Sequence, residues 1–144
     1  MTKSLNDSPL PLTTLSEEER LFSSSVLEFA AKEIGPHVAE MDQSCTFNPI
    51  LIRRFFEQGF MSIEVPEALG GSGGTFFLSV LAVEALAQVD ASAAVIVDVQ
   101  NTLVNNALLH WGTDEQKRTF LPRLASDTVG AYALSEAASG SDAF

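Results

Sequence analysis

The stretch "AYALSEAASGSDAF" at residues 131–144 holds the side chains whose types and spacing best suit ligand binding. The hydroxyls of Ser135, Ser139 and Ser141 alternate there with Ala and Gly. Small side chains let a ligand approach the backbone, where free N–H groups and hydroxyls can donate hydrogen bonds. The same pattern is typical of a strand end and a surface turn, with Tyr132 and Leu134 in the core. Taken by itself, the pattern favours this second interpretation.

Histidine and cysteine are too few for a metal centre or a thiol nucleophile. His37 and His110 have no further ligands at metal-binding spacing, so hydrogen-bonded or exposed histidines are expected. Cys45 is the single cysteine, so these 144 residues cannot form an internal disulfide, and no local motif pairs it with a histidine. We expect no metal site and no cysteine chemistry.

The glycines of "VPEALGGSGG" suggest a phosphate-binding loop but do not match one. Gly70, Gly71, Gly73 and Gly74 fit neither the dinucleotide fingerprint nor a P-loop, since no Gly-Lys-Ser/Thr follows and no convincing strand precedes them. We predict that residues 60–74 form an extended passage and a flexible loop.

Length and charge narrow the class of protein. The chain has 144 residues, 46% of them hydrophobic, which is typical of one globular domain. A net charge of -11 disfavours binding to nucleic acid or to anionic membranes. Glu84 and Asp90 interrupt the most apolar region, so no membrane span is expected. Residues 1–14 match neither a signal nor a transit peptide and are expected to be flexible.

Helical signals dominate the elements that must position the terminal stretch. Capping boxes start at Ser16 and Thr113, Asn48 is an expected N-cap, and Asp90 or Ser92 caps another helix. The predicted helices cover residues 15–36, 48–59, 75–90, 91–112 and 113–126, with a short turn after Pro36. Pro122 is expected to end or kink the last of them.

Periodicity also predicts which side chains face the core. The expected inward residues are Phe22, Val26, Phe29, Ala30, Ile34, Val38, Met41, Ile52, Phe55, Phe56, Phe77, Val80, Leu81 and Leu86. Trp111 is expected to be a packing residue. Asn101, Asn105 and Asn106 lie in an otherwise apolar helix and form either the floor of a substrate cavity or a solvated stripe. The fold class is therefore mainly α, with roughly six helices followed by a first strand in "TVGAYALS" at residues 128–135.

Several segments together resemble a known family. The segments "VPEALGGSGG", "VEALAQVDAS", "NTLVNN", "WGTDEQKRTFLPRLAS" and "AYALSEAASGSDAF" occur in the order and at nearly the spacing seen in the N-terminal half of acyl-CoA dehydrogenases. "VQNTLVNN" and "LSEAASGSD" look most like the short/branched-chain members, which act on 2-methyl-branched acyl-CoA. The resemblance runs from about Leu15 to Phe144.

The resemblance implies a domain plan and a reaction. Residues 15–128 would form the N-terminal helical domain, and residues 129–144 the start of a truncated middle β-domain. The family removes a proton and a hydride from the α and β carbons of short or branched-chain acyl-CoA, as in fatty acid metabolism and branched-chain amino acid catabolism. FAD takes the hydride, and electrons pass to electron-transfer flavoprotein. The catalytic glutamate belongs to a C-terminal bundle, so no catalytic residue is assigned here and the isolated chain is expected to be inactive.

The resemblance also implies binding residues. The family's flavin-contacting segment falls on Tyr132, Ala133, Leu134, Ser135, Glu136, Ala137, Ala138, Ser139, Gly140 and Ser141. Ser135 would donate its hydroxyl to FAD, Ser141 would also lie near acyl-CoA, and Asp142 would brace the turn. Ala138 and Ser139 replace the family's usual Gly and Ala, and a positive φ at position 138 would cost alanine about 1 kcal/mol.

The resemblance also implies an oligomeric state and a cellular location. The full-length form would be a homo-oligomer in the mitochondrial matrix, or in the cytoplasm of a bacterium, without a nucleic-acid or membrane partner. Two alternatives stay open at this point. One is a non-catalytic helical module for interaction or dimerisation, and the other is a related acyl-CoA oxidase that uses oxygen as the electron acceptor.

Overall fold

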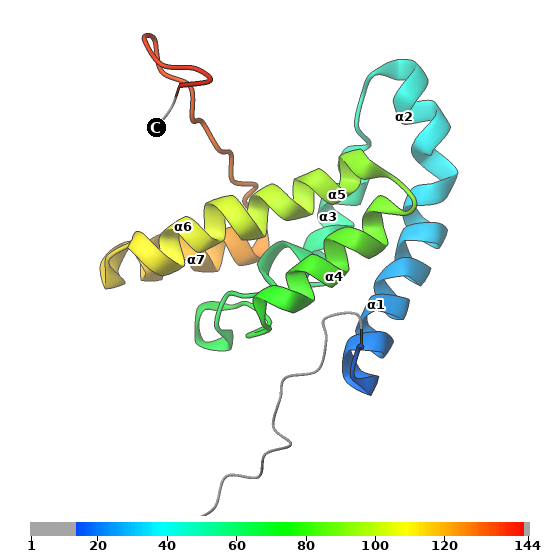
Figure 1. The fold of residues 1–144 in the computed structure, drawn as a ribbon, viewed down its shortest axis with the longest axis horizontal. Coiled ribbons are helices and arrows are strands. Elements are labelled where there is room, and N and C mark those ends of the chain that lie inside the picture. Colours follow the sequence, from blue (N-terminus) through cyan, green and yellow to red (C-terminus); the bar gives the residue numbers. More distant parts are fainter. Residues whose placement is uncertain (1–13, 143–144) are drawn as a thin grey trace, which may run out of the picture.

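The computed structural model describes residues 14–142, so the segment predicted to be flexible at 1–14 lies, except for Thr14, outside the described residues. The described part is mainly helical, as predicted (Figure 1). In chain order the elements are α1 (Glu17–Phe29), the π-helical η1 (Ala30–Ile34), the 3-10 turn η2 (Gly35–His37), α2 (Val38–Ser44), α3 (Pro49–Glu57), the 3-10 turns η3 (Phe60–Ser62) and η4 (Glu67–Leu69), α4 (Phe76–Ala87), α5 (Ala91–Asp98), the π-helical η5 (Val99–Asn105), α6 (Asn106–Trp111) and α7 (Asp114–Ser126).

One long rod organises the helices. α5, η5 and α6 follow one another without a break, and Figure 1 shows them as a continuous rod. α4 packs between α1 and α5, while α7 packs along α6 and η5. The rod therefore contacts both halves of the domain.

The helices begin where the cap signals predict. Both capping boxes form, at Ser16 and at Thr113. Asn48 caps α3 by accepting the N–H of Ile50 at 3.0 Å. Asp90, and not Ser92, caps α5, since its Oδ1 accepts the N–H of Ala93 at 2.6 Å. Local hydrogen bonding thus sets the starts of these helices.

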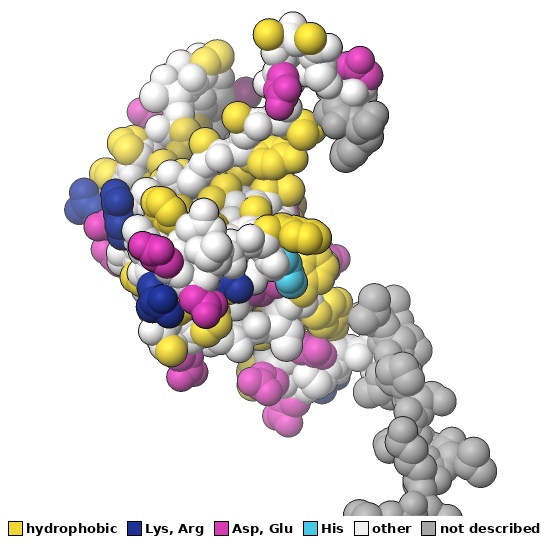
Figure 2. Space-filling view, turned by 90° about the vertical axis from the view of Figure 1, so that its left-hand side faces the viewer, with side chains coloured by type: hydrophobic (Ala, Val, Ile, Leu, Met, Phe, Trp, Pro, Cys, Tyr) yellow, Lys and Arg dark blue, Asp and Glu magenta, His cyan; other side chains and the backbone are white. Residues whose placement is uncertain are grey.

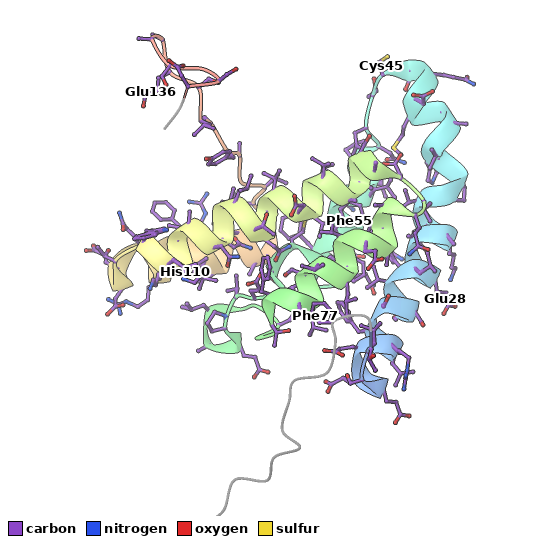
Figure 3. The ribbon with its side chains drawn as sticks, in the orientation of Figure 1. Glu28, Cys45, Phe55, Phe77, His110 and Glu136 are labelled. Carbon is purple, nitrogen blue, oxygen red and sulfur yellow. The ribbon has the colours of Figure 1, made fainter. Side chains whose placement is uncertain are left out.

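The core forms around fully buried aromatic and aliphatic side chains. Phe55 is completely buried near the centre of the molecule (Figure 3). The ring of Phe29 packs edge-on against that of Phe60, with centroids 5.1 Å apart. Most of the predicted inward residues are buried or pack against this core, but Val80 is 40% exposed. The prediction was wrong there because α4 is apolar nearly all round, so periodicity does not define its solvent face.

Proline does not end the last helix. α7 continues through Pro122 to Ser126, contrary to one of the two expected outcomes. Leu121 and Leu124 on either side of the proline are buried against Val65. This packing offsets the backbone hydrogen bond that proline cannot donate. Pro36 also fails to end the helical path, which was predicted to stop at residues 35–36 and instead continues as the 3-10 turn η2 into α2. Pro36 stands at the start of η2, where its missing N–H costs no hydrogen bond.

The loop at residues 60–74 is compact, whereas the sequence predicted a flexible one. The N–H groups of Ser72, Gly73 and Gly74 donate to the carbonyls of Ser62, Val65 and Ile63, at 3.0, 2.9 and 2.7 Å. These donors are used within the loop, which agrees with a turn and not with a phosphate cradle. The loop folds back on itself and closes one side of the core.

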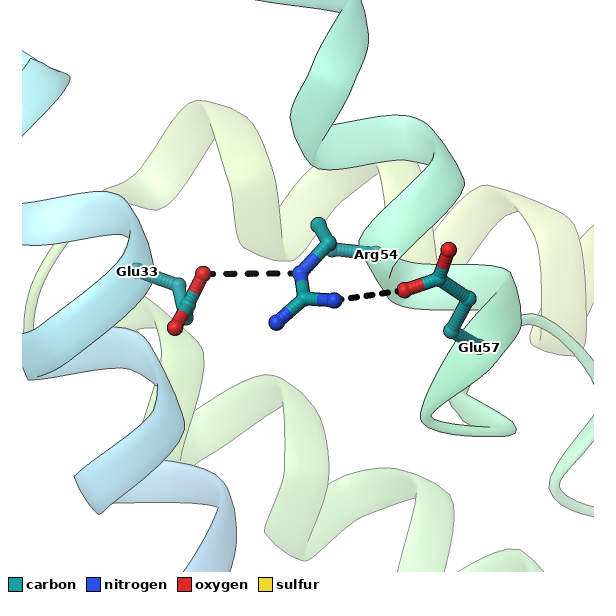
Figure 4. Close-up of polar contacts among 3 residues, drawn as sticks. All are labelled: Glu33, Arg54 and Glu57. Carbon is teal, nitrogen blue, oxygen red and sulfur yellow. Dashed lines mark hydrogen bonds and ion pairs between the residues drawn. The ribbon is translucent and has the colours of Figure 1, made fainter.

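An exposed ion-pair cluster joins η1 to α3. Arg54 contacts Glu33 at 3.4 Å and Glu57 at 2.7 Å (Figure 4). The hydrogen bond to Glu57, and next the charge of Glu33, raise the pKa of the Arg54 guanidinium. Because these side chains are well exposed, solvent screens the pairs and their contribution to stability is small.

The strand predicted at residues 128–135 does not form among the described residues. This stretch runs without regular structure, and the one β-bridge in the described part joins Glu136 to Ser139. A strand requires a neighbour for its N–H and C=O groups, and the helices offer none. The alternating sequence pattern is therefore present, but the described residues contain no sheet in which it could form a strand.

Gly71→Ala should destabilise the domain. A β-carbon at this position would overlap the carbonyl oxygen of Val65 and the Val65 side chain, which are held in place by the loop. We expect the free energy of unfolding in urea to fall by about 1–3 kcal/mol, as for other overpacked sites.

Gly140→Ala is the matched control, since nothing lies within 4 Å of a β-carbon built there. Its urea midpoint should equal that of the parent chain. Equal midpoints for the two variants would show that the close contact at Gly71 is not tight in solution.

Candidate functional site

The candidate segment, residues 132–141, leaves the helices just after α7. α7 ends at Ser126 with Asp127 as its C-cap, and Thr128 donates its N–H to the carbonyl of Arg123 at 2.9 Å. Beyond this point the chain rises away from the rod, as Figure 1 shows. Glu136 lies on this raised part, well separated from the helices (Figure 3). The segment is therefore exposed to solvent and does not pack against the helices.

A buried amide holds the chain just before the candidate segment. The side chain of Gln100, on η5, donates to the carbonyls of Leu124 at 2.9 Å and Thr128 at 3.1 Å. It also accepts the N–H of Gly130 at 2.7 Å. Gly130 lies so close to Val104 that a β-carbon there would overlap its side chain. The sequence interpretation did not single out Gln100, although a glutamine in an apolar helix was the signal that could have found it.

The far end of the candidate segment is a small turn. Glu136 and Ser139 exchange backbone hydrogen bonds of 2.8 and 3.3 Å. Asp142 braces this turn, as expected: its Oδ1 accepts the N–H of Gly140 at 2.9 Å, and its carbonyl accepts the Ser139 hydroxyl at 3.1 Å. Among the described non-glycine residues only Cys45 has a positive φ. Ala138 therefore has no positive φ, and the cost of about 1 kcal/mol that such a conformation would carry does not arise.

The candidate segment is open to a ligand. Residues 131–138 are exposed, with Tyr132 at 53% and Leu134 at 45%, so the interpretation that places these two side chains in the core is wrong. Ser135 is exposed, and in the part of the chain that the structure describes neither its hydroxyl nor its N–H makes a hydrogen bond. The segment thus offers hydrogen-bond donors beside apolar side chains.

An apolar flank adjoins the foot of the candidate segment. Figure 2 shows hydrophobic side chains gathered on the helices beneath the raised end of the chain. A groove of about 370 Å³ lies there, and its apolar lining includes Val104, Leu108, Phe120 and Ala131. Exposed hydrophobic surface next to free donors suits a ligand or a protein surface with both apolar and polar parts.

The three asparagines form neither a cavity floor nor a solvated stripe. Asn101 is fully buried and bonds the carbonyl of Phe60 at 2.7 Å and the N–H of Ile63 at 2.9 Å. Asn105 is also fully buried and donates to the carbonyl of Met61 at 2.9 Å. Asn106 is half-buried and faces the carboxylate of Glu64.

Asn101 and Asn105 therefore support the backbone of the loop that begins at residue 60, while Asn106 contacts a side chain of that loop. In the described part, the Oδ1 atoms of Asn105 and Asn106 are buried without a hydrogen-bond partner.

The remaining candidates lie apart from the candidate segment. Cys45 and His110 stand at opposite ends of the molecule (Figure 3). Within residues 14–142 no group of three or more His, Cys, Asp or Glu is placed to hold a metal ion, and no helix is long and apolar enough to cross a membrane. Trp111, expected to pack, is 88% exposed at the end of α6, because residues 14–142 provide no neighbour that covers it.

An unexpected groove accompanies the exposed side of α4. Its volume is about 390 Å³, and its lining includes Phe76, Val80, Val83 and Thr102. Sequence periodicity placed Val80 in the core, so this groove was missed. The sequence signal was the lack of any polar stripe on α4.

Comparison with known proteins assigns this helical architecture to a family. The family model described as "Acyl-CoA dehydrogenase, N-terminal domain" matches residues 16–128. The short/branched chain specific acyl-CoA dehydrogenase of Bos taurus, a mitochondrial protein, is 44% identical over 140 residues, covering 96% of this chain and 32% of that protein. A probable short/branched chain specific acyl-CoA dehydrogenase of Dictyostelium discoideum is 45% identical over 134 residues, covering 93% and 32%.

Solved structures show the same helical arrangement. Butyryl-CoA dehydrogenase from Megasphaera elsdenii superposes with a TM-score of 0.83 at 31% identity, over 90% of this chain and 35% of that one. A chain from a structure of the electron transferring flavoprotein of Acidaminococcus fermentans gives 0.85 at 33% identity, over 90% and 34%. The 144 residues span about a third of the length of the relatives that they match. The chain belongs to the acyl-CoA dehydrogenase family, in which it corresponds to the N-terminal helical domain.

Proposed function

We propose that this chain is the N-terminal part of a flavin-dependent dehydrogenase that introduces an α,β double bond into short or branched-chain acyl-CoA. The observation that carries the proposal is the candidate segment, which projects exposed donors beside an apolar flank. The 42–45% identity of this chain to short/branched chain specific relatives supports the proposed substrate class. Electron-transfer flavoprotein is the proposed electron acceptor.

The donor set of the candidate segment fits an isoalloxazine ring. The free N–H and hydroxyl of Ser135 can donate to carbonyl oxygens or ring nitrogens, and the exposed ring of Tyr132 offers an apolar surface. Gly140 has open space around it, so a flat ligand could approach the backbone there. We propose that residues 132–141 hold FAD and that Ser141 also contacts acyl-CoA.

The roles divide between this chain and sequence outside it. Bound FAD would supply the acceptor for the hydride from the β carbon. The described residues would bind and orient the flavin, and the apolar flank would exclude water from one side of it. None of these 144 residues is proposed as the base that removes the α proton. We therefore propose that the chain alone is inactive. From the family resemblance we also propose that the whole protein is a homo-oligomer. By analogy with the bovine and rat relatives it would work in mitochondria.

Joining the chain to the remaining downstream part of the bovine relative should restore a flavoenzyme. This completed chain should show a flavin absorption spectrum that is bleached by 2-methyl-branched acyl-CoA, with electrons passing to electron-transfer flavoprotein. The 144 residues alone should show neither signal, because they provide only one side of the flavin site.

The downstream part alone is the control for this experiment and should also lack activity. Turnover by the 144 residues, or a completed chain without flavin, would contradict the proposal. Oxygen as the preferred acceptor would favour the oxidase, and stable association of the 144 residues with a partner without flavin would favour the non-catalytic module.

Ser135→Ala in the completed chain should weaken FAD binding about tenfold, the effect of losing one hydrogen bond of typical strength. The affinity would be measured by flavin fluorescence after reversible release of FAD. The free energy of unfolding of the 144 residues should not change, because the Ser135 hydroxyl makes no hydrogen bond among the described residues.

Ser25→Ala is the matched control, since Ser25 is exposed on α1 and distant in sequence from the candidate segment. It should leave FAD affinity unchanged. Equal affinities for both variants and the parent would remove Ser135 from the proposed flavin site.

A further inference from the structure

The side chain of Gln100 joins three backbone groups at the point where the chain leaves the helices. Its Nε2 donates to the carbonyls of Leu124 and Thr128, and its Oε1 accepts the N–H of Gly130. Gln100 is fully buried, and both ends of its amide are paired. A buried amide whose nitrogen and oxygen are both hydrogen-bonded holds its partners in one geometry, since a shift leaves a polar group unpaired.

The π-helical turn of η5 explains how this amide comes to face the exit of the chain. Gln100 and Asn101 are neighbours in sequence, yet both side chains are fully buried. A π-helical turn is wider than an α-helical one, and such turns often occur at functional sites. Asn101 contacts the loop at Phe60 and Ile63, whereas Gln100 contacts the chain between Leu124 and Gly130. The two amides therefore hold different parts of the backbone in place.

The hydrogen bond to Gly130 is the last one between the helices and the rising chain in the described part of the structure. Beyond it, the hydrogen bonds are those within the turn at Glu136–Ser139 and its brace from Asp142. Gly130 also lies directly against the side chain of Val104, so the chain cannot move toward the rod. The position and direction from which residues 132–141 depart are thus set by one polar bond and one steric contact.

We propose that Gln100 is a positioning residue for flavin binding: it fixes the departure of residues 132–141 so that their donors meet the ring. This inference rests on the proposed function, in which residues 132–141 hold FAD. Gln100 itself is too deeply buried to touch the cofactor, and it acts through Gly130. A purely structural glutamine would stabilise the fold without affecting the flavin.

The first experiment measures amide hydrogen exchange in the 144 residues, with no flavin involved. Gln100→Met keeps the size of the side chain and removes its hydrogen bonds. Exchange at Gly130 should become about tenfold faster, the factor expected for one lost hydrogen bond. Asn101→Leu is the matched control: it removes an equally buried amide from the same helix, but one that contacts only the loop and its own helix. It should leave Gly130 unchanged relative to the core amides of α4.

The second experiment measures FAD affinity and the flavin absorption spectrum in the completed chain. Gln100→Met should weaken FAD binding about tenfold and shift the absorption maximum, while Asn101→Leu should do neither at a comparable loss of thermal stability. Gly130→Ala provides a second variant that leaves Gln100 intact. It would press the chain against Val104 and should weaken FAD binding in the same direction.

The outcomes separate this inference from the proposed function. A parent completed chain that binds no FAD would refute the proposed function, while exchange at Gly130 would still report on the anchor. A parent that binds FAD, with Gln100→Met and Asn101→Leu binding it equally well, would refute the positioning role alone. Unchanged exchange at Gly130 in Gln100→Met would also overturn it.

Discussion

Buried amide side chains on one helical rod are the interaction on which the rest of this domain depends. Gln100, Asn101 and Asn105 are all fully buried in an otherwise apolar helix. Each bonds a backbone carbonyl outside the α-helices, at Thr128, Phe60 and Met61 respectively, and a buried carbonyl needs such a partner. The compact loop at residues 60–74 and the chain around residues 124–130 keep their places for this reason.

The same arrangement gives the domain a rigid body and one projecting end. On the inner side of the rod, apolar packing and the amides fix the loop and α7 together. At the end of the rod Trp111 is exposed, and beyond α7 so are Val129, Tyr132 and Leu134. Such a distribution is costly for an isolated domain, since exposed apolar surface favours association. In the proposed flavoenzyme, the cofactor and the sequence beyond this chain would cover it.

Local signals in the sequence predicted most helix starts, because capping depends on residues only a few positions apart. The two capping boxes and the Asn48 cap are of this kind. Predictions that needed a neighbour were less successful. Val80 was misplaced because α4 carries no polar stripe, and α7 continues through Pro122 because packing from Val65 outweighs the local preference. The predicted strand found no partner among the described residues.

The sequence by itself determined the mainly helical class, most of the helix starts and the family, since caps, periodicity and colinear segments are all properties of the chain order. It also located the candidate segment, although only through the family resemblance. The tertiary structure alone decided what the buried amides do and where the candidate segment departs. The physical reason is that Gln100 and Gly130 lie 30 positions apart, and their hydrogen bond exists only after η5 and α7 have packed together.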